Sequence, residues 1–327
     1  MLRVVRLKAP YEITKPGAYA IPDAAYRADP CPTPSLTQST IKTLLDTSPA
    51  HAFLESPRLN PDFEPDDPTK YDVGSIAHRY LIGRGKEVVV LDGSFEDWRK
   101  KEAQELRKKH TGQGLLAVLK KDADLATAMV EVAKQRQEEF KIGDAFNEGW
   151  GEVVLAWQEG DVWMRTMIDW VTLNGPFYDY KTTKLSVAPH ALGWMAANAG
   201  WDIQAAMIER GLSVIDPANA GRRKARFIAQ EARPPFAMSV MQMRESWLVM
   251  GRKKVAVGMG IWKSCLEAND WPAYPTSLCE PEYPTPAETS FLAREEEMSV
   301  QGVWSSLTMA PVRAGKHDAD FGDIKGG

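Results

Sequence analysis

Three short apolar runs follow one another in the middle of the chain, and each ends at a turn signal. Residues 152–157, 162–171 and 177–181 are too short for helices and are rich in residues that favour strands. The segments between them, 158–161 and 174–176, contain glycine and are short enough to form hairpin turns. The pattern therefore predicts three antiparallel strands in a meander.

Other periodic segments surround this meander. Helical patterns cover residues 36–54 and about 189–210, strands are expected at 226–231 and 237–243, and a long helix runs through Leu266. Together these elements predict an α+β fold. Its central mixed sheet contains the antiparallel meander and is flanked by helices.

The remaining segments indicate how the chain is organised into domains. The first 35 residues carry several prolines and little periodicity, so we expect them to wrap the core. Helical patterns from about 95 to 141 form an insertion ahead of the meander. Residues 288–327 have an acidic, glycine-ending composition that predicts a flexible tail, which leaves one domain over residues 1–287.

Strand geometry brings charged residues of the meander together. Side chains alternate along a strand, so Asp179 and Lys181 project from one face and Tyr180 from the other. Folding the second hairpin about residues 174–175 sets Asp169 across from Asp179 to Lys181. The first hairpin, folded about residues 159–160, pairs Glu152 with about Met167. Glu152 then lies diagonal to Asp169 and on its face.

Three carboxylates around one point repel one another unless a cation lies between them. Oxygen ligands of this kind suit Mg²⁺, with Mn²⁺ as a substitute. A lysine two residues from a metal-binding aspartate can orient the attacking water, help it to lose a proton, or neutralise charge on a scissile phosphate. The alternative is structural: Asp179 and Lys181 form a surface ion pair, and Asp169 caps a turn.

These residues, with others on both flanks, resemble the motifs of the PD-(D/E)XK nuclease superfamily. Within it, the chain is most similar to phage and prophage recombination exonucleases of the exodeoxyribonuclease VIII type. The resemblance spans about residues 11–286. It is carried by these residues: Gly74-Ser75-Ile76-Ala77-His78, Glu152, Ile168-Asp169, Asp179-Tyr180-Lys181-Thr182-Thr183 and Gln204, with weaker likeness at 48–51 and 231–235.

The resemblance implies a set of site residues and an activity. His78, Glu152, Asp169 and Asp179 would hold the metal, Lys181 would serve catalysis, and Gln204 would support the site. The implied activity is Mg²⁺-dependent exonuclease action on double-stranded DNA ends, with 5′-to-3′ polarity, to expose single strands for recombination. The 95–141 insertion would then form one wall of a DNA channel. By resemblance alone, a single-strand annealing protein is an expected partner, and the chain is expected to form a homo-oligomer.

Two of these residues also have structural interpretations. His78 lies in a helical pattern that Ser75 can cap, where a lone histidine is commonly a half-buried structural group. Gln204 lies on an apolar helical stripe, so its amide would be buried and would need hydrogen-bond partners. Related nucleases often carry a tyrosine four residues after this glutamine, whereas this chain has Ile208. That departure concerns how the substrate end is handled.

The overall charge gives no bulk attraction to DNA. The formal net charge is −4, so any DNA-binding surface must be local. The basic residues that we expect to contact DNA are Arg165, Arg222, Arg223 and Lys224. Other basic clusters, at 99–101 and 107–109, are interspersed with acidic residues and are interpreted as solvated surface.

Further features exclude several classes of protein. The 3 cysteines include no CxxC pair, so neither a disulfide framework nor a zinc ribbon is expected. No apolar segment is long enough for a membrane span, and we expect the protein in the cytoplasm. No Walker loop is present. The rival functions are a non-catalytic DNA-binding module on a nuclease fold and a structure-selective endonuclease, because the same metal centre serves several substrates.

Overall fold

A computed structural model describes residues 2–65, 73–143 and 145–300 of the chain. The chain divides into two compact units, Met1–Tyr274 and Pro275–Gly327. The second unit contains helix α10 (Thr285–Val300), so the expected tail begins within a helix, and its residues 301–327 lie outside the described ranges. All further elements belong to the first unit.

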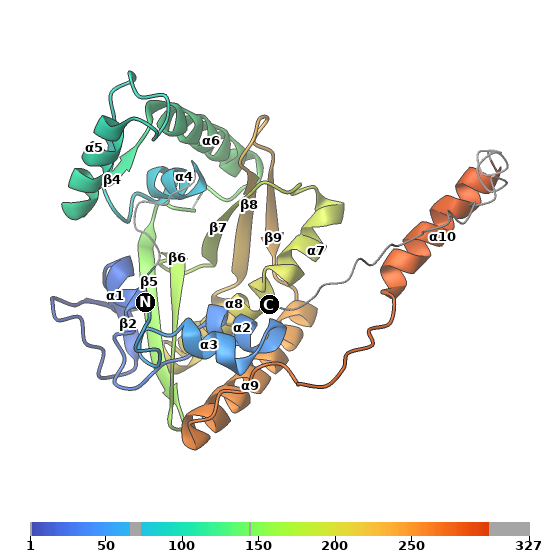
Figure 1. Ribbon diagram of the computed structural model, residues 1–327. Helices are drawn as coiled ribbons and strands as arrows, with labels where there is room; N and C mark the ends of the chain where they lie inside the picture. The colour runs from blue at the N-terminus through green and yellow to red at the C-terminus, as the bar shows by residue number, and fades with distance from the viewer. Residues whose placement is uncertain (1, 66–72, 144, 301–327) are drawn as a thin grey trace, which may run out of the picture. The chain divides into compact units, whose positions relative to one another are not determined.

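A seven-stranded mixed sheet forms the centre of this unit (Figure 1). The order β1-β2-β5-β6-β7-β8-β9 places the predicted meander, β5 to β7, in the middle. Strands β1 and β2 pair in parallel, as do β7 and β8, and the other neighbours are antiparallel. The strands are β1 (Val4–Arg6), β2 (Gly17–Ala20), β5 (Gly149–Glu159), β6 (Val162–Thr172), β7 (Phe177–Thr183), β8 (Ala225–Glu231) and β9 (Met238–Gln242).

Helices cover both faces of the sheet because its side chains alternate between apolar clusters on the two faces. One cluster joins Val153, Leu155 and Trp157 of β5 to α2, α3, α7, α8 and α9. Another joins Tyr178 and Tyr180 of β7 to α4 and α6. The helices are α1 (Asp23–Arg27), α2 (Gln38–Asp46), α3 (Pro49–Leu54), α4 (Val73–Ile82), α5 (Lys101–Gly112), α6 (Lys120–Glu139), α7 (Pro189–Asn198), α8 (Trp201–Ile215), α9 (Glu245–Ala268) and the 3₁₀ helix η1 (Ala220–Arg222).

Three local expectations are wrong. The first 35 residues do not only wrap the core, because β1 and β2 extend the central sheet at its edge. The helix expected at 189–210 is two helices, since Gly200 between them has a φ of +72°. The insertion is not purely helical: β3 (Val88–Val90) and β4 (Leu116–Val118) pair in parallel beside α5 and α6.

The register of the first hairpin differs by two residues from the expectation. Glu159 pairs with Val162, so the turn lies one residue later and Val154, not Glu152, faces Met167. Glu152 instead comes opposite Asp169, between the flanking pairs Gly151–Trp170 and Val153–Ile168. A two-residue shift preserves the face on which side chains project. Glu152 therefore lies across from Asp169 along the ladder rather than diagonal to it.

None of the helices in the described ranges combines the length and the apolar composition that a membrane span requires.

Candidate active site

Strand β7 supplies an aspartate and a lysine from the same face, as the alternation predicted. The Lys181 Nζ lies 2.6 Å from Asp179 Oδ1. The other carboxylate oxygen, Oδ2, accepts a hydrogen bond from the Nε2 of Gln204, which reaches across from α8. Asp179 is fully buried, and its Oδ1 has no aligned hydrogen-bond donor despite the nearby ammonium. Tyr180 points to the opposite face, into the cluster with α4 and α6.

Asp169 lies where strands β6 and β7 separate. Backbone pairing between them covers only Trp170–Tyr178 and Val171–Phe177. Beyond these pairs the Asp169 carboxylate takes the place of a backbone acceptor, because its Oδ2 accepts the amide N–H of Tyr180 at 2.8 Å. The same oxygen lies 3.1 Å from Nε2 of His78 on α4. The interrupted ladder thus sets a carboxylate between the strand of Asp179 and helix α4.

Glu152 completes the acidic group from a distorted position in β5. Its φ of +53° is unusual for a residue with a side chain and occurs where the β5–β6 ladder is interrupted. The Glu152 carboxylate is close to Gly85, on which an added Cβ would lie 3.2 Å from Oε1. The loop after α4 therefore packs directly against this carboxylate.

Burial and neighbouring charges shift the pKa values of the ionisable groups at the site. Burial, with help from the charge of Asp169, raises the pKa of Asp179 to about 6. Burial also raises the pKa of Glu152. Burial alone would raise the pKa of Asp169, but His78 and Lys181 hold it below its ordinary value. Burial likewise opposes the charged forms of His78 and Lys181, yet the adjacent carboxylates raise the pKa of both.

This donor set fits a divalent cation. Three carboxylates and an imidazole, from β5, β6, β7 and α4, offer the hard ligands that Mg²⁺ and Mn²⁺ prefer. The buried Asp179 Oδ1 without an aligned donor is an oxygen that a cation can satisfy. Among the described residues, no three acidic, histidine or cysteine side chains already converge at coordination distance. Lys181 and Gln204 hold Asp179, while His78 and Tyr180 hold Asp169.

Two of the predicted DNA contacts are wrong. Arg165 is buried, and its NH1 lies 3.0 Å from Oδ1 of Asp29, which is also buried. Arg223 is buried as well, where it donates to the carbonyl of Thr172 at 2.9 Å and pairs with Asp216 at 3.3 Å. Both guanidiniums tie distant segments together, so neither is accessible to a phosphate.

The other two predicted DNA contacts, Arg222 and Lys224, are exposed. They precede the start of β8, whereas the residue of β8 that pairs with Lys181 is Ala229. At about 3.3 Å per strand residue, Lys224 lies roughly 16 Å from the level of Lys181. The structure does not bring these two residues to the acidic group, and their role stays a prediction.

The sequence analysis missed a buried residue behind the site. The Tyr180 hydroxyl donates to Gln230 Oε1 at 2.5 Å. Gln230 Nε2 in turn donates to the carbonyls of Met129 on α6, at 3.0 Å, and Phe236, at 3.2 Å. Gln230 is fully buried, so these bonds satisfy its amide and anchor the back of the Asp-Tyr-Lys segment. Because β8 also contains Arg226 and Glu231, no local pattern marks Gln230 as buried.

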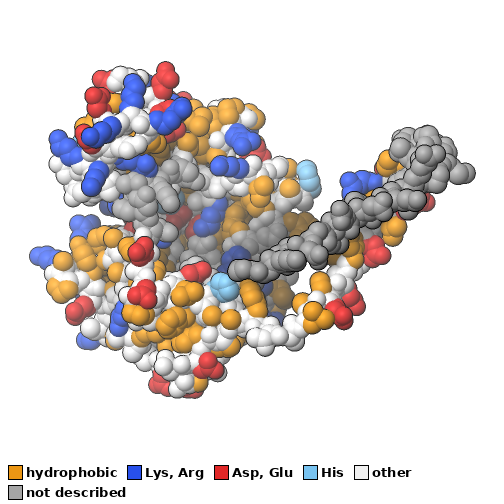
Figure 2. Space-filling view, in the orientation of Figure 1, with side chains coloured by type: hydrophobic (Ala, Val, Ile, Leu, Met, Phe, Trp, Pro, Cys, Tyr) orange, Lys and Arg blue, Asp and Glu red, His pale blue; other side chains and the backbone are white. Residues whose placement is uncertain are grey.

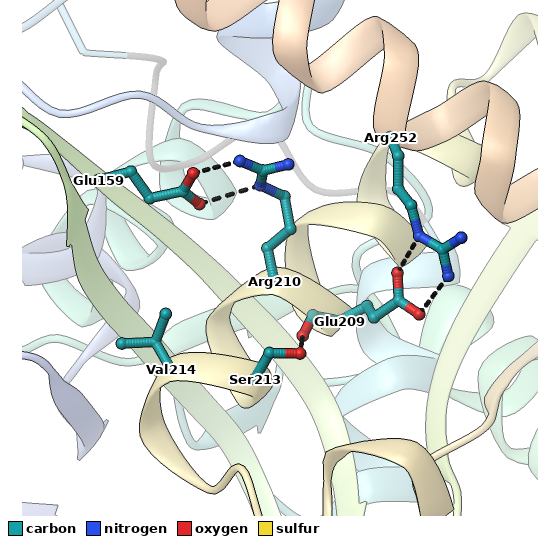
Figure 3. Close-up of a pocket in the computed structure, with 6 residues that line it drawn as sticks. All are labelled: Glu159, Glu209, Arg210, Ser213, Val214 and Arg252. Atoms are coloured by element: carbon teal, nitrogen blue, oxygen red, sulfur yellow. Dashed lines mark hydrogen bonds and ion pairs between the residues drawn. The ribbon is translucent and has the colours of Figure 1, made fainter.

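A surface hollow lies away from the acidic group (Figure 3). It has a volume of about 550 Å³ and is lined by Glu159, Glu209, Arg210, Ser213, Val214 and Arg252. Glu159 is at the far end of β5 from Glu152, roughly 23 Å away along the strand. Arg210 pairs with Glu159, and Arg252 pairs with Glu209 at 2.6 Å. The arrangement is that of paired surface charges rather than of a reaction centre.

One face of the first unit is hollowed in the space-filling view (Figure 2). In Figure 2 this face is indented between the part that contains α4 to α6 and the part that contains α2 and α3. Lys, Arg, Asp and Glu side chains are interspersed on the part with α5 and α6. The exposed surface of the insertion is thus mixed in charge, in agreement with the interpretation of its basic clusters as solvated surface.

A mixed sheet that carries aspartate and lysine two residues apart on a central strand defines a PD-(D/E)XK nuclease-like fold. The chain belongs to the family described as a PDDEXK-like domain of unknown function (DUF3799), which matches residues 37–282. A crystal structure of a putative exonuclease from Eubacterium rectale shares the fold, with a TM-score of 0.51 and 13% sequence identity. That similarity covers 76% of this chain and 91% of the other. No curated protein sequence matches this chain.

These comparisons confirm the predicted superfamily and fold class. The narrower likeness to exonucleases of the exodeoxyribonuclease VIII type stays a prediction.

Proposed function

We propose that this protein is a divalent-metal-dependent deoxyribonuclease that hydrolyses phosphodiester bonds from the ends of duplex DNA. The observation that supports it most strongly is the burial of Asp179 between Lys181 and Gln204, beside the carboxylate of Asp169. Burying several carboxylates together costs free energy that a structural ion pair does not require. A reaction centre that binds a cation accounts for that cost.

Each side chain has a separate task in this proposal. Asp169, Asp179, Glu152 and His78 would hold the metal, which in such nucleases acidifies a water molecule and offsets charge on the phosphate. Lys181 is held protonated by the two aspartates, so it acts as a fixed positive charge beside the scissile phosphate.

Gln204 acts through Asp179. Its amide donates to one carboxylate oxygen and leaves Oδ1 toward the cation site. An amide that hydrogen-bonds to a metal-binding carboxylate fixes the orientation of that ligand without touching the substrate. His78 orients Asp169 in the same way, from the opposite side of the sheet.

The finer parts of the proposal rest on the resemblance of the motifs. They are the use of Mg²⁺ with Mn²⁺ as a substitute and 5′-to-3′ digestion that exposes single strands for recombination. Location in the cytoplasm is proposed separately, from the sequence pattern. The same resemblance supports a homo-oligomer and a single-strand annealing partner. The domain assignment, residues 1–287 with the insertion as a channel wall, belongs to the same proposal.

Digestion of linear and covalently closed circular duplex DNA tests the proposal. Each substrate is incubated with protein and Mg²⁺, and parallel reactions contain EDTA, the Lys181→Ala variant or the Lys184→Ala variant. Lys184 is an exposed lysine three residues further along, so it matches the charge change outside the site. We expect loss of linear DNA alone, abolished by EDTA and by Lys181→Ala and preserved in Lys184→Ala.

Other outcomes select the rival functions. Cutting of the closed circles would favour an endonuclease, whereas cutting of neither substrate would favour a non-catalytic DNA-binding module. Polarity is measured on duplexes with phosphorothioate linkages at either the 5′ or the 3′ ends. Protection by the 5′ block alone is expected, and protection by the 3′ block alone would overturn the assigned polarity.

A further inference from the structure

The loop that follows α4 packs over the acidic group. It connects helix α4 to strand β3, and its first four residues are Gly83, Arg84, Gly85 and Lys86. Gly83 and Gly85 have φ values of +71° and +93°, a backbone region that favours glycine. An added Cβ on Gly85 would also lie 3.2 Å from Glu152 Oε1. Both glycines let the backbone turn tightly against the carboxylate.

The ends of this loop are fixed. The amide of Gly83 donates to the carbonyl of Arg79 at 3.0 Å, and the Nε of Arg79 donates to the carbonyl of Lys86 at 2.9 Å. The next residue, Glu87, accepts the amide of Leu116 on β4 at 2.8 Å. The loop is therefore closed on itself by one arginine and attached to the small parallel sheet, which leaves its tip in a defined place.

Arg84 occupies that tip and lies beside the acidic group. Its aliphatic stem crosses Gly151, the residue before Glu152: an added Cβ on Gly151 would lie 2.6 Å from Arg84 Cγ. The same Cβ would lie 3.2 Å from the ring of Trp170, the residue after Asp169. Arg84 thus lies over two positions that directly adjoin metal-binding carboxylates.

The guanidinium of Arg84 is not used by the protein. Arg84 is exposed, and within the described residues it makes no hydrogen bond, ion pair or ring contact. The other arginine of this segment, Arg79, donates to a backbone carbonyl, and Arg165 and Arg223 are buried in ion pairs. A charged fork with a positioned stem and no partner is suited to bidentate binding of a phosphate.

We propose that Arg84 binds a backbone phosphate of the DNA next to the scissile one, with the glycine loop holding its stem at that distance. This inference rests on the proposed nuclease function and adds to it the contact that positions the substrate. Arg84 has a role in binding. It contacts the strand equally in the ground state and the transition state, so its loss raises KM more than it lowers kcat.

Fluorescence anisotropy with a labelled duplex of 20 base pairs tests whether Arg84 contacts a DNA phosphate. Binding is measured in Ca²⁺, which keeps the DNA uncut, across a series of salt concentrations. In Arg84→Ala the Kd is expected to rise about tenfold, and the slope of log Kd against log salt to fall by about 0.9, as for one lost phosphate contact. Arg84→Lys keeps a positive charge and should recover most of the salt slope.

Arg99→Ala is the matched control. Arg99 lies in the 95–141 insertion, is 91% exposed and forms an ion pair with Asp97, so its loss changes the net charge equally but removes no contact near the acidic group. Its Kd and salt slope should equal those of the wild type. Equal Kd and slope in Arg84→Ala and Arg99→Ala would overturn the inference.

The same variants separate this inference from the proposed function. With Mg²⁺, Arg84→Ala should raise KM about tenfold and keep kcat within about threefold of the wild type. If the wild type binds DNA without cutting it and Arg84→Ala binds more weakly, the nuclease proposal is overturned and the Arg84 contact with phosphate is supported. Wild-type cleavage with an unaltered KM in Arg84→Ala would overturn only the contact. Wild-type protein that neither binds nor cuts DNA would overturn both.

Discussion

Helices α8 and α9 cross closely at only one of two glycines in α9. Substitution by alanine should therefore change protein stability in opposite directions at the two positions. Gly251 and Gly260 both lie within α9 (Glu245–Ala268). An added Cβ on Gly251 would lie 2.1 Å from the carbonyl oxygen of Asp202 on α8, whereas the space around Gly260 is open to 4 Å. Alanine at these positions therefore probes packing and helix propensity separately.

The contact at Gly251 involves backbone, so it cannot be relieved by a change of rotamer. Relief of a 2.1 Å approach requires α8 and α9 to move apart by more than about 1 Å, and overpacking of this kind costs about 3 kcal/mol. For a domain of this size that free energy corresponds to a fall in Tm of about 6 to 12 °C. Gly260→Ala removes a flexible residue from an exposed helical position and should add up to about 1 kcal/mol.

Function provides a second readout of the same movement. Asp202 lies two residues before Gln204, which donates to the buried carboxylate of Asp179. Under the proposed function, Gly251→Ala should therefore lower kcat as well as Tm, because it displaces the amide that orients Asp179. Gly260→Ala should leave kcat unchanged.

Thermal unfolding followed by tryptophan fluorescence and circular dichroism measures both substitutions. The chain contains 11 tryptophans, one of which, Trp201, begins α8. A Tm for Gly251→Ala within 1 °C of the wild type, or an equal fall in both variants, would refute the packing argument.

Three further predictions follow from buried contacts. Arg165→Met leaves the buried carboxylate of Asp29 unpaired and should lower the free energy of unfolding by about 3 to 5 kcal/mol in urea titrations, while DNA affinity of the folded protein stays unchanged. Tyr180→Phe deprives Gln230 Oε1 of its donor and should cost about 1 to 2 kcal/mol in the same assay; an unchanged midpoint would contradict the hydrogen bond. Mn²⁺ at a hundredfold excess over its Kd should stabilise the wild type by about 2.7 kcal/mol, and Asp179→Asn should abolish most of that shift in calorimetry.

The central strands could be predicted because their signals are local. The runs that became β5, β6 and β7 are largely apolar, too short for helices and separated by short turns, so chain proximity alone favours their pairing. The parity of the side chains placed Asp179 and Lys181 together, and the structure shows Nζ of Lys181 2.6 Å from Oδ1 of Asp179. The register of the first hairpin was two residues wrong because the turn position was uncertain by one residue.

Residues whose partners lie far along the chain could not be assigned in the same way. Arg165 was expected to be an exposed cation that contacts DNA. Its partner Asp29 instead comes from the segment between α1 and α2, far away along the chain. Gln230 likewise depends on Met129 of the insertion. Nothing near either residue in the sequence indicates burial or the identity of the partner.

Local alternation along β7 and the spacing of the acidic residues already placed the carboxylates and the lysine on one face, since both follow from covalent geometry and side-chain chemistry. The resemblance of the motifs then indicated a nuclease-like core. Long-range packing decided the rest. It placed β1 and β2 at the sheet edge, brought His78 and Gln204 to opposite sides of the aspartates, and set the stem of Arg84 over Gly151. These outcomes depend on burial and on hydrogen bonds between segments that only the folded chain brings within reach.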